Sequence, residues 1–151
     1  MARRLALLPA AALVATLALA SSASLASAAT TTLTTPMTGA EERPGPGDPN
    51  GKGWISLEVD SNGTICYEAK IQAIGHVISD AHIHLAPAGS PGGVVVPLEP
   101  NEADRTGNMY SHCVTTSPTT AAAIMTNPSA YYVNWHTPAF PAGAIRGQLG
   151  D

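Results

Sequence analysis

Two histidines, His82 and His84, flank Ile83 in a stretch of the 151-residue chain that alternates polar and apolar residues. In a β-strand this spacing places both imidazoles on one face of the sheet, and Asp80 shares that face. Copper and zinc favour imidazole nitrogens, so such a pair can bring two ligands to one metal ion, with His136 as the third. The alternative is a solvated or internally hydrogen-bonded sheet face on which the histidines orient loops.

A second polar face is expected near the end of the chain. His136 shares one face of an expected strand with Tyr132 and Asn134. Arg146 and Gln148 share one face of the strand that follows. If these strands neighbour the strand with the histidine pair, their polar faces form one cluster. The candidate binding residues are His82, His84, Asn134, His136 and Arg146, and the candidate metal ligands are His82, His84 and His136.

No set of residues in the sequence matches a complete catalytic site. The nucleophile-elbow pattern G-x-S-x-G is absent, and no glycine-rich phosphate loop precedes a helix. Glu41 and Glu42 lie at the start of a segment rich in proline and glycine, and the other carboxylates are dispersed. Paired carboxylates for glycoside hydrolysis therefore cannot be assigned, and we assign no catalytic residue.

The elements that must position these residues have a sequence period of two. Ile55, Leu57 and Val59 alternate with polar residues, and the alternation returns at 65–71 after the turn residues 60–63. This pattern predicts a β-hairpin with a short Asn-Gly loop. Further strands are expected at 77–85, 93–98, 109–115, 131–136 and 144–149.

The remaining chain adds two elements. Residues 33–37 predict a strand at the edge of a sheet, because Pro36 has no N–H for a central ladder. Pro118–Thr126 predicts a short helix, which Ser117 can cap and which Asn127 ends before a proline. Short strands separated by Pro/Gly-rich loops indicate an all-β fold, an antiparallel sandwich or Greek-key barrel with one short helix.

Residues 1–28 predict a cleaved signal peptide. Arg3 and Arg4 precede an apolar stretch at 5–20, and Ala26-Ser27-Ala28 is typical of a cleavage site. A membrane anchor is the alternative, but the stretch is short for a span of about 20 residues. We expect a secreted, monomeric single domain at 29–151 with no membrane span.

Without the leader the formal charge moves from −4 to −6, because the leader carries two arginines and no acidic residue. An acidic domain with no basic run is not expected to bind nucleic acid. Its partner or ligand would be an extracellular one that the sequence does not name.

The chain has two cysteines, Cys66 and Cys113. In an oxidising compartment a lone pair is expected to form a disulfide, and two free thiols are the alternative. The bond would close a loop of 48 residues. In the chain-entropy model such a loop stabilises the fold by about 4 kcal/mol.

Several stretches resemble the CHRD domain, the module first described in chordin. Its central motif is similar to Ala81-His82-Ile83-His84 followed by the turn to residues 93–98. Its closing motif is similar to residues 131–137 and 141–149, and its opening strand to residues 33–46. The sequence departs from the family at Ala144, where an acidic residue is frequent, and after His84, where glycine is frequent. The resemblance implies an immunoglobulin-like β-barrel or sandwich with no catalytic activity attached to it.

A more distant resemblance is to the copper/zinc superoxide dismutases. It would make His82 and His84 metal ligands, with His136 or His112 completing a copper site and Arg146 guiding the anion. The glycine-rich second histidine cluster of that family is missing here. We therefore expect a secreted CHRD domain that acts as a non-catalytic binding or structural module. The alternative is an extracytoplasmic metal-binding protein that uses copper or zinc.

Overall fold

The computed structural model describes residues 28–75 and 77–150. Positions 1–27 of the predicted signal peptide lie outside the described residues. Within the described residues, strands alternate with one α-helix and short 3-10 helices (η). In chain order the elements are β1 (Thr30–Thr38), η1 (Gly39–Glu41), β2 (Lys52–Asp60), β3 (Thr64–Gln72), β4 (Asp80–Leu85), β5 (Gly93–Pro97), η2 (Glu102–Asp104), β6 (Arg105–Thr106), β7 (Met109–Thr115), α1 (Pro118–Thr126), η3 (Pro128–Ala130), β8 (Tyr131–Thr137) and β9 (Phe140–Gln148).

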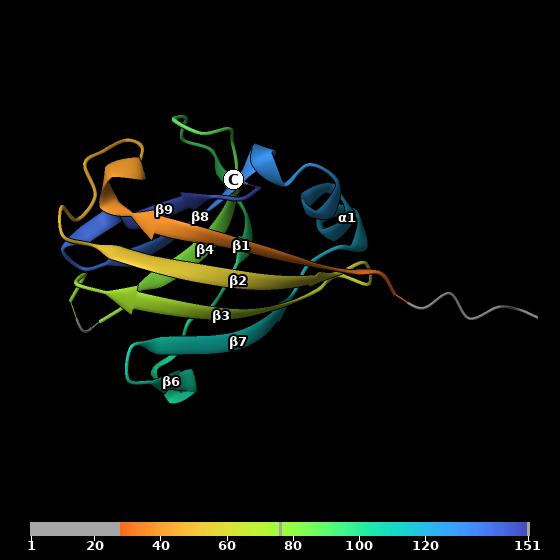
Figure 1. Cartoon of the computed structure of the whole chain (residues 1–151), viewed down its shortest axis with the longest axis horizontal. Helices are drawn as coiled ribbons and strands as arrows, with labels where there is room; N and C mark the ends of the chain where they lie inside the picture. Colours follow the sequence, from red (N-terminus) through yellow and green to blue (C-terminus); the bar gives the residue numbers. More distant parts are fainter. Residues whose placement is uncertain (1–27, 76, 151) are drawn as a thin grey trace, which may run out of the picture.

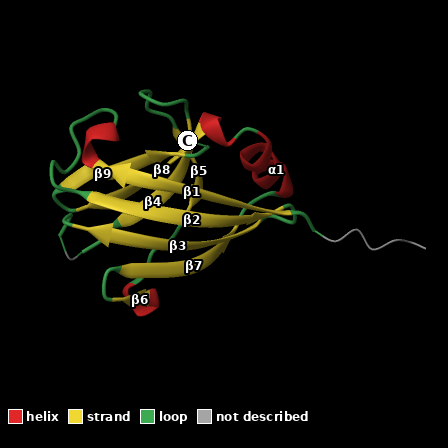
Figure 2. Ribbon diagram, in the orientation of Figure 1, coloured by secondary structure: helices red, strands yellow, loops and turns green. Residues whose placement is uncertain are grey.

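The strands form one antiparallel sheet in the order β5-β4-β8-β9-β1-β2-β3-β7-β6. The sheet curls, so that β1, β2, β3 and β7 lie in front of β9, β8 and β4 (Figure 1). The all-β class with one short α-helix is thereby confirmed. Helix α1 covers one end of the curled sheet (Figure 2), and no helix of the described residues is long and apolar enough to cross a membrane.

The two halves of the curled sheet enclose the apolar core. Trp135 of β8 is fully buried there. Its indole packs against the rings of Tyr67 and Tyr110, with centroids 6.0 and 5.2 Å away. Packing of this kind joins strands that come from opposite ends of the sheet order.

The hairpin and the helix form where the sequence predicts them. β2 pairs with β3, and Ile55, Leu57 and Val59 are fully buried. Gly63 closes the turn with a φ of 101°, and a Cβ there would collide with a neighbouring carbonyl oxygen. Helix α1 has the predicted bounds, because the Ser117 hydroxyl accepts a hydrogen bond from the backbone N–H three residues later at its start.

Three expectations about strands are wrong. β1 lies inside the sheet, between β9 and β2, although it contains Pro36. Its ladder with β9 has one pair, Thr38 with Arg146, so β1 remains nearly an edge strand on that side. β4 begins at Asp80 instead of residue 77, and Leu85 at its end is half-exposed instead of filling the core.

The predicted disulfide is confirmed. Cys66 of β3 and Cys113 of β7 are directly paired across the two strands, and their sulfurs are bonded. The described residues contain no free cysteine. The bond therefore joins the two strands near one end of the sheet order, away from β4 and β8.

Candidate functional site

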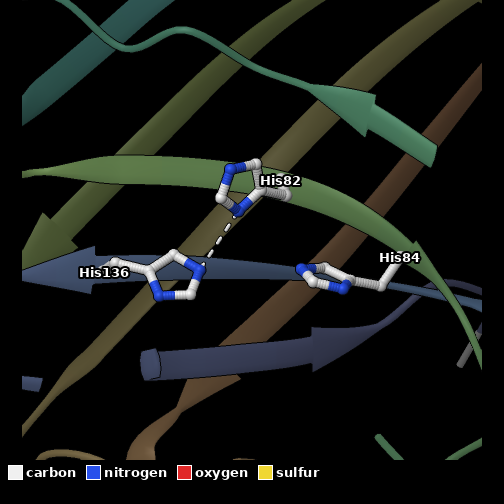
Figure 3. Close-up of side chains that lie close together, drawn as sticks. All are labelled: His82, His84 and His136. Atoms are coloured by element: carbon white, nitrogen blue, oxygen red, sulfur yellow. Dashed lines mark hydrogen bonds between the residues drawn. The ribbon is translucent and has the colours of Figure 1, made fainter. Parts of the chain in front are cut away.

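The pairing of β4 with β8 brings the candidate histidines together. His82 lies opposite Asn134, and His136 lies opposite Asp80, one alternate pair along the same face. Figure 3 shows the rings of His82, His84 and His136 turned toward one another. Each offers a nitrogen, and these three atoms all lie within 4.8 Å of one another.

The facing nitrogens gather around the side-chain amide of Asn134. Its Oδ1 lies 2.9 Å from His84 Nε2 and 3.0 Å from His136 Nε2. His82 Nδ1 lies 3.2 Å from the same His136 nitrogen. Three ring nitrogens and one amide oxygen therefore converge on one small volume.

The outer nitrogen of each ring contacts a further hydrogen-bond acceptor. His84 Nδ1 is 2.9 Å from the Gly92 carbonyl oxygen, and His136 Nδ1 is 3.1 Å from the Pro141 carbonyl oxygen. His82 Nε2 is 3.1 Å from a carboxylate oxygen of Asp80 on the same strand. A neutral imidazole that donates its outer N–H to such an acceptor presents the lone pair of its inner nitrogen.

The environment disfavours protonation of two of these rings. Burial lowers the pKa of His84, against the opposing effect of its hydrogen bond to Gly92. Burial likewise lowers the pKa of His136, against its hydrogen bond to Pro141. Burial therefore favours the neutral form of both rings, which is the form that binds a metal.

The loop between β4 and β5 covers the part of the polar face that holds Arg146. Arg146 is almost fully buried and donates hydrogen bonds to the carbonyl oxygens of Ser90 and Pro87. Its guanidinium carbon lies 3.4 Å from the centre of the Tyr132 ring, which also stacks on His84. Arg146 is thus engaged inside the fold and is not presented to solvent as an anion-guiding group.

Gln148, two residues after Arg146 on β9, makes further hydrogen bonds in the same region. Its amide nitrogen donates to the carbonyl oxygens of Ala86, Ser129 and Tyr131. Its oxygen accepts a hydrogen bond from Arg146. The polar side chains that the sequence places on this face therefore do lie together, but under a loop instead of in solvent.

One residue of the site has no signal in the sequence. Glu42 follows η1 and is almost fully buried, and neither of its carboxyl oxygens makes a well-formed hydrogen bond to a described residue. The carboxyl group lies directly against Gly143, where a Cβ would collide with it. Burial raises its pKa from 4.5 to about 7, while the charge of Arg146 and the amide of Asn134 oppose that shift.

His112, the other candidate for a third ligand, does not belong to the cluster. It lies on β7 opposite Tyr67 of β3, and the group of potential ligands within the described residues consists of His82, His84 and His136.

Comparison with known proteins gives a family and no individual relative. No curated protein and no solved structure matches the chain. The CHRD domain matches residues 33–149, nearly all of the described chain. Both histidine-bearing strands and the loop that holds Glu42 fall within this match. The chain therefore belongs to the CHRD-domain family.

Proposed function

We propose that this protein is a secreted, non-catalytic binding domain whose ligand is a divalent transition-metal ion, held by His82, His84 and His136. The observation that supports this most directly is the orientation of the three rings. Each turns one nitrogen toward the others while its second nitrogen meets an acceptor. Metal-ligating histidines characteristically donate their second N–H to a carbonyl or carboxylate, which fixes the tautomer.

The hydrogen bonds of the cluster can be completed in two ways, by a bound cation or by an Asn134 amide that turns its NH₂ toward the rings. Either neutral tautomer of His84 leaves one lone pair facing an oxygen, because both of its nitrogens contact oxygen acceptors. A second proton on the ring would remove the mismatch, but burial lowers the pKa of the ring. A bound metal ion satisfies the inner nitrogens without that proton.

The donor set indicates which metals fit. Imidazole ligands suit zinc and copper, and the carboxylate-rich set that magnesium or calcium requires is missing among the inner atoms of the described residues. Ligands about 2.0–2.1 Å from a tetrahedral ion lie about 3.3 Å apart. The 3.2 Å between His82 Nδ1 and His136 Nε2 already matches, so the remaining pairs, all within 4.8 Å, need to close by about 1.5 Å at most.

The dismutase-like alternative uses the same ligands but also needs an arginine that is placed to attract superoxide. Arg146 is buried and bonded to loop carbonyls, so it is not placed to attract superoxide. We therefore propose binding without turnover. Family membership, the disulfide and the predicted leader support secretion. We also propose that the protein is a monomer and that the curled sheet belongs to the immunoglobulin-like Greek-key class.

Metal titration tests the proposal. The mature, tag-free protein is stripped with EDTA, titrated with Zn²⁺ and Cu²⁺ by calorimetry, and analysed for metal content. We expect one ion per chain and a loss of affinity of more than about tenfold in His82→Ala, His84→Ala and His136→Ala. His112→Ala is the matched control and should bind like the wild type.

Two results would contradict the proposal. Metal binding no tighter in the wild type than in the His136→Ala variant would remove the site. Superoxide turnover by the loaded protein, abolished in His82→Ala, would show that the domain is an enzyme.

A further inference from the structure

The Cys66–Cys113 disulfide lies on the outer face of the sheet. Tyr67 of β3 and Val114 of β7 point into the core, whereas the cysteines next to them in sequence point the other way. Cys113 is exposed and Cys66 is half-buried. This face is turned toward the viewer in Figure 1, and no other element is drawn in front of β3 and β7. A reagent can therefore reach the bond in the folded protein.

The bond lies in a surface hollow with an acidic wall. The hollow has a volume of about 550 Å³, and both cysteines line it together with Glu58 and Glu68. Glu58 of β2 is paired directly with Cys66, and Glu68 follows Cys66 by two residues on the same face of β3. No lysine or arginine of the described chain lines the hollow. The two carboxylates therefore repel an incoming thiolate and the negative charge that spreads over the sulfurs as it reacts.

The two sulfurs differ in how a nucleophile can approach them. A thiolate attacks one sulfur in line with the S–S bond, from the side opposite the sulfur that leaves. The in-line path to Cys66 Sγ passes over β2, where Glu58 is paired with it. The path to Cys113 Sγ comes from beyond β7, where β6 pairs with the first two residues of β7 only. Ser111 and Thr115, the neighbours of Cys113 on the same face, are uncharged. Cys113 Sγ is therefore the accessible sulfur.

β3 and β7 stay paired when the bond is broken. Their ladder runs from the pair Thr64 and Thr115 to the pair Lys70 and Met109. The inner side chains of both strands belong to the apolar core, which the sulfurs do not enter. The reduced cysteines would thus remain opposite each other, so that the bond can form again. Exposed disulfides are the labile ones, in which exchange serves regulation or catalysis.

We propose that the Cys66–Cys113 bond is a thiol–disulfide exchange site that is attacked at Cys113 Sγ, and that its reductants are dithiols with positive charge beside the reacting thiol. The thiolate of the reductant bonds to Cys113 Sγ, the S–S bond breaks, and Cys66 leaves as a thiolate. The second thiolate of the reductant then attacks its own sulfur in the mixed disulfide and releases Cys113. The reductant loses two electrons and becomes a disulfide, and its two protons reach the cysteines through water. This inference is independent of metal binding.

Mapping the first adduct tests the site of attack. The oxidised protein, in EDTA, is treated briefly with the monothiol cysteamine, and iodoacetamide then blocks every free thiol. Trypsin separates the two cysteines, because Lys70 and Arg105 lie between them. We expect mass spectrometry to find cysteamine on Cys113 and the alkylated thiol on Cys66. Adducts mainly on Cys66 would overturn the assignment.

The kinetics show whether the folded protein is the species that reacts. Because the bond is open to solvent, the rate of reduction should rise linearly with thiol concentration and should not increase in urea below the unfolding transition. A rate that levels off at the unfolding rate would mean that thiols reach only the unfolded chain, which would refute the proposal.

A charge series tests the selectivity of the hollow. Cysteamine carries an ammonium group, whereas 2-mercaptoethanesulfonate carries a second negative charge, and each rate is divided by the rate with a small uncharged disulfide. The wild type should prefer cysteamine. Glu58→Gln should reduce this preference about threefold at low salt, the effect of one unit charge at about 5 Å in water. Glu41→Gln, at an exposed carboxylate of η1, is the matched control and should keep the preference. Equal rates with the wild type, or an unchanged preference in Glu58→Gln, would contradict the selectivity.

Discussion

Glu42 gives the metal-free protein a pH-dependent stability whose sign follows from its burial. The pKa of its carboxyl group rises from 4.5 to about 7 on folding, chiefly through burial. Between these two values the folded protein holds a proton that the unfolded chain has released. The stabilisation is therefore fully present below about pH 4.5 and is lost as the pH rises through about 7.

The size of the effect has an upper limit. A pKa difference of one unit corresponds to about 1.36 kcal/mol, so the shift of Glu42 amounts to about 3 kcal/mol at most. Solvent screens the charge of this group little, because Glu42 is 1% exposed. Arg146, Arg43 and Asn134 favour the ionised form, and their opposing effects are already part of the shift.

The assay compares the wild type with Glu42→Gln, unfolded by urea in EDTA from about pH 4.5 to about pH 8. The buried histidines act in the opposite direction, since a lowered pKa makes stability fall as the pH falls. Both proteins contain these histidines, so the difference between the two curves isolates Glu42. We expect the wild type to lose up to about 3 kcal/mol relative to the variant as the pH rises. A difference that stays constant with pH would refute the burial argument.

Three more predictions concern the fold. Replacing Cys66 and Cys113 by alanine should lower the free energy of unfolding by about 4 kcal/mol, measured by urea denaturation; an unchanged midpoint would mean that the bond does not restrain the unfolded chain. Trp135→Ala should destabilise the protein by about 3–5 kcal/mol in the same assay, because the indole is fully buried between aromatic rings, and a negligible loss would contradict its place in the core. Gly143→Ala should destabilise by more than about 1 kcal/mol, since φ is 139° and the new Cβ would collide with the Glu42 carboxyl group; Gly107→Ala, where φ is also positive but no atom lies within 4 Å, is the control that separates backbone strain from the collision.

Sequence reasoning succeeds where local chemistry decides the structure. Ser117 and Asn127 give the helix bounds because capping is a short-range interaction. The faces of β2 and β3 follow from alternation, since one face of each strand is buried in the core. The shared face of His82 and His84 follows from the same period of two.

The errors come from contacts between distant parts of the chain. The proline rule places β1 at an edge, but its contact with β9 has so little ladder that Pro36 is tolerated inside the sheet. Alternation also gives no sign that a loop covers the outer face of β8 and β9, where Arg146 is buried. The burial of Glu42 cannot be predicted from the local sequence, because it depends on Gly143, which lies far from it along the chain.

The ladder between β1 and β9 has a single pair, so we expect the sheet to separate most readily between these two strands. It divides the sheet into one hydrogen-bonded block of β5, β4, β8 and β9 and another of β1, β2, β3, β7 and β6. The histidines belong to the first block and the disulfide to the second. Native-state hydrogen exchange should resolve the blocks as two cooperative units, with slowed amide exchange on metal binding concentrated in the first. A metal ion and a covalent bond would then each protect a different half of one sheet.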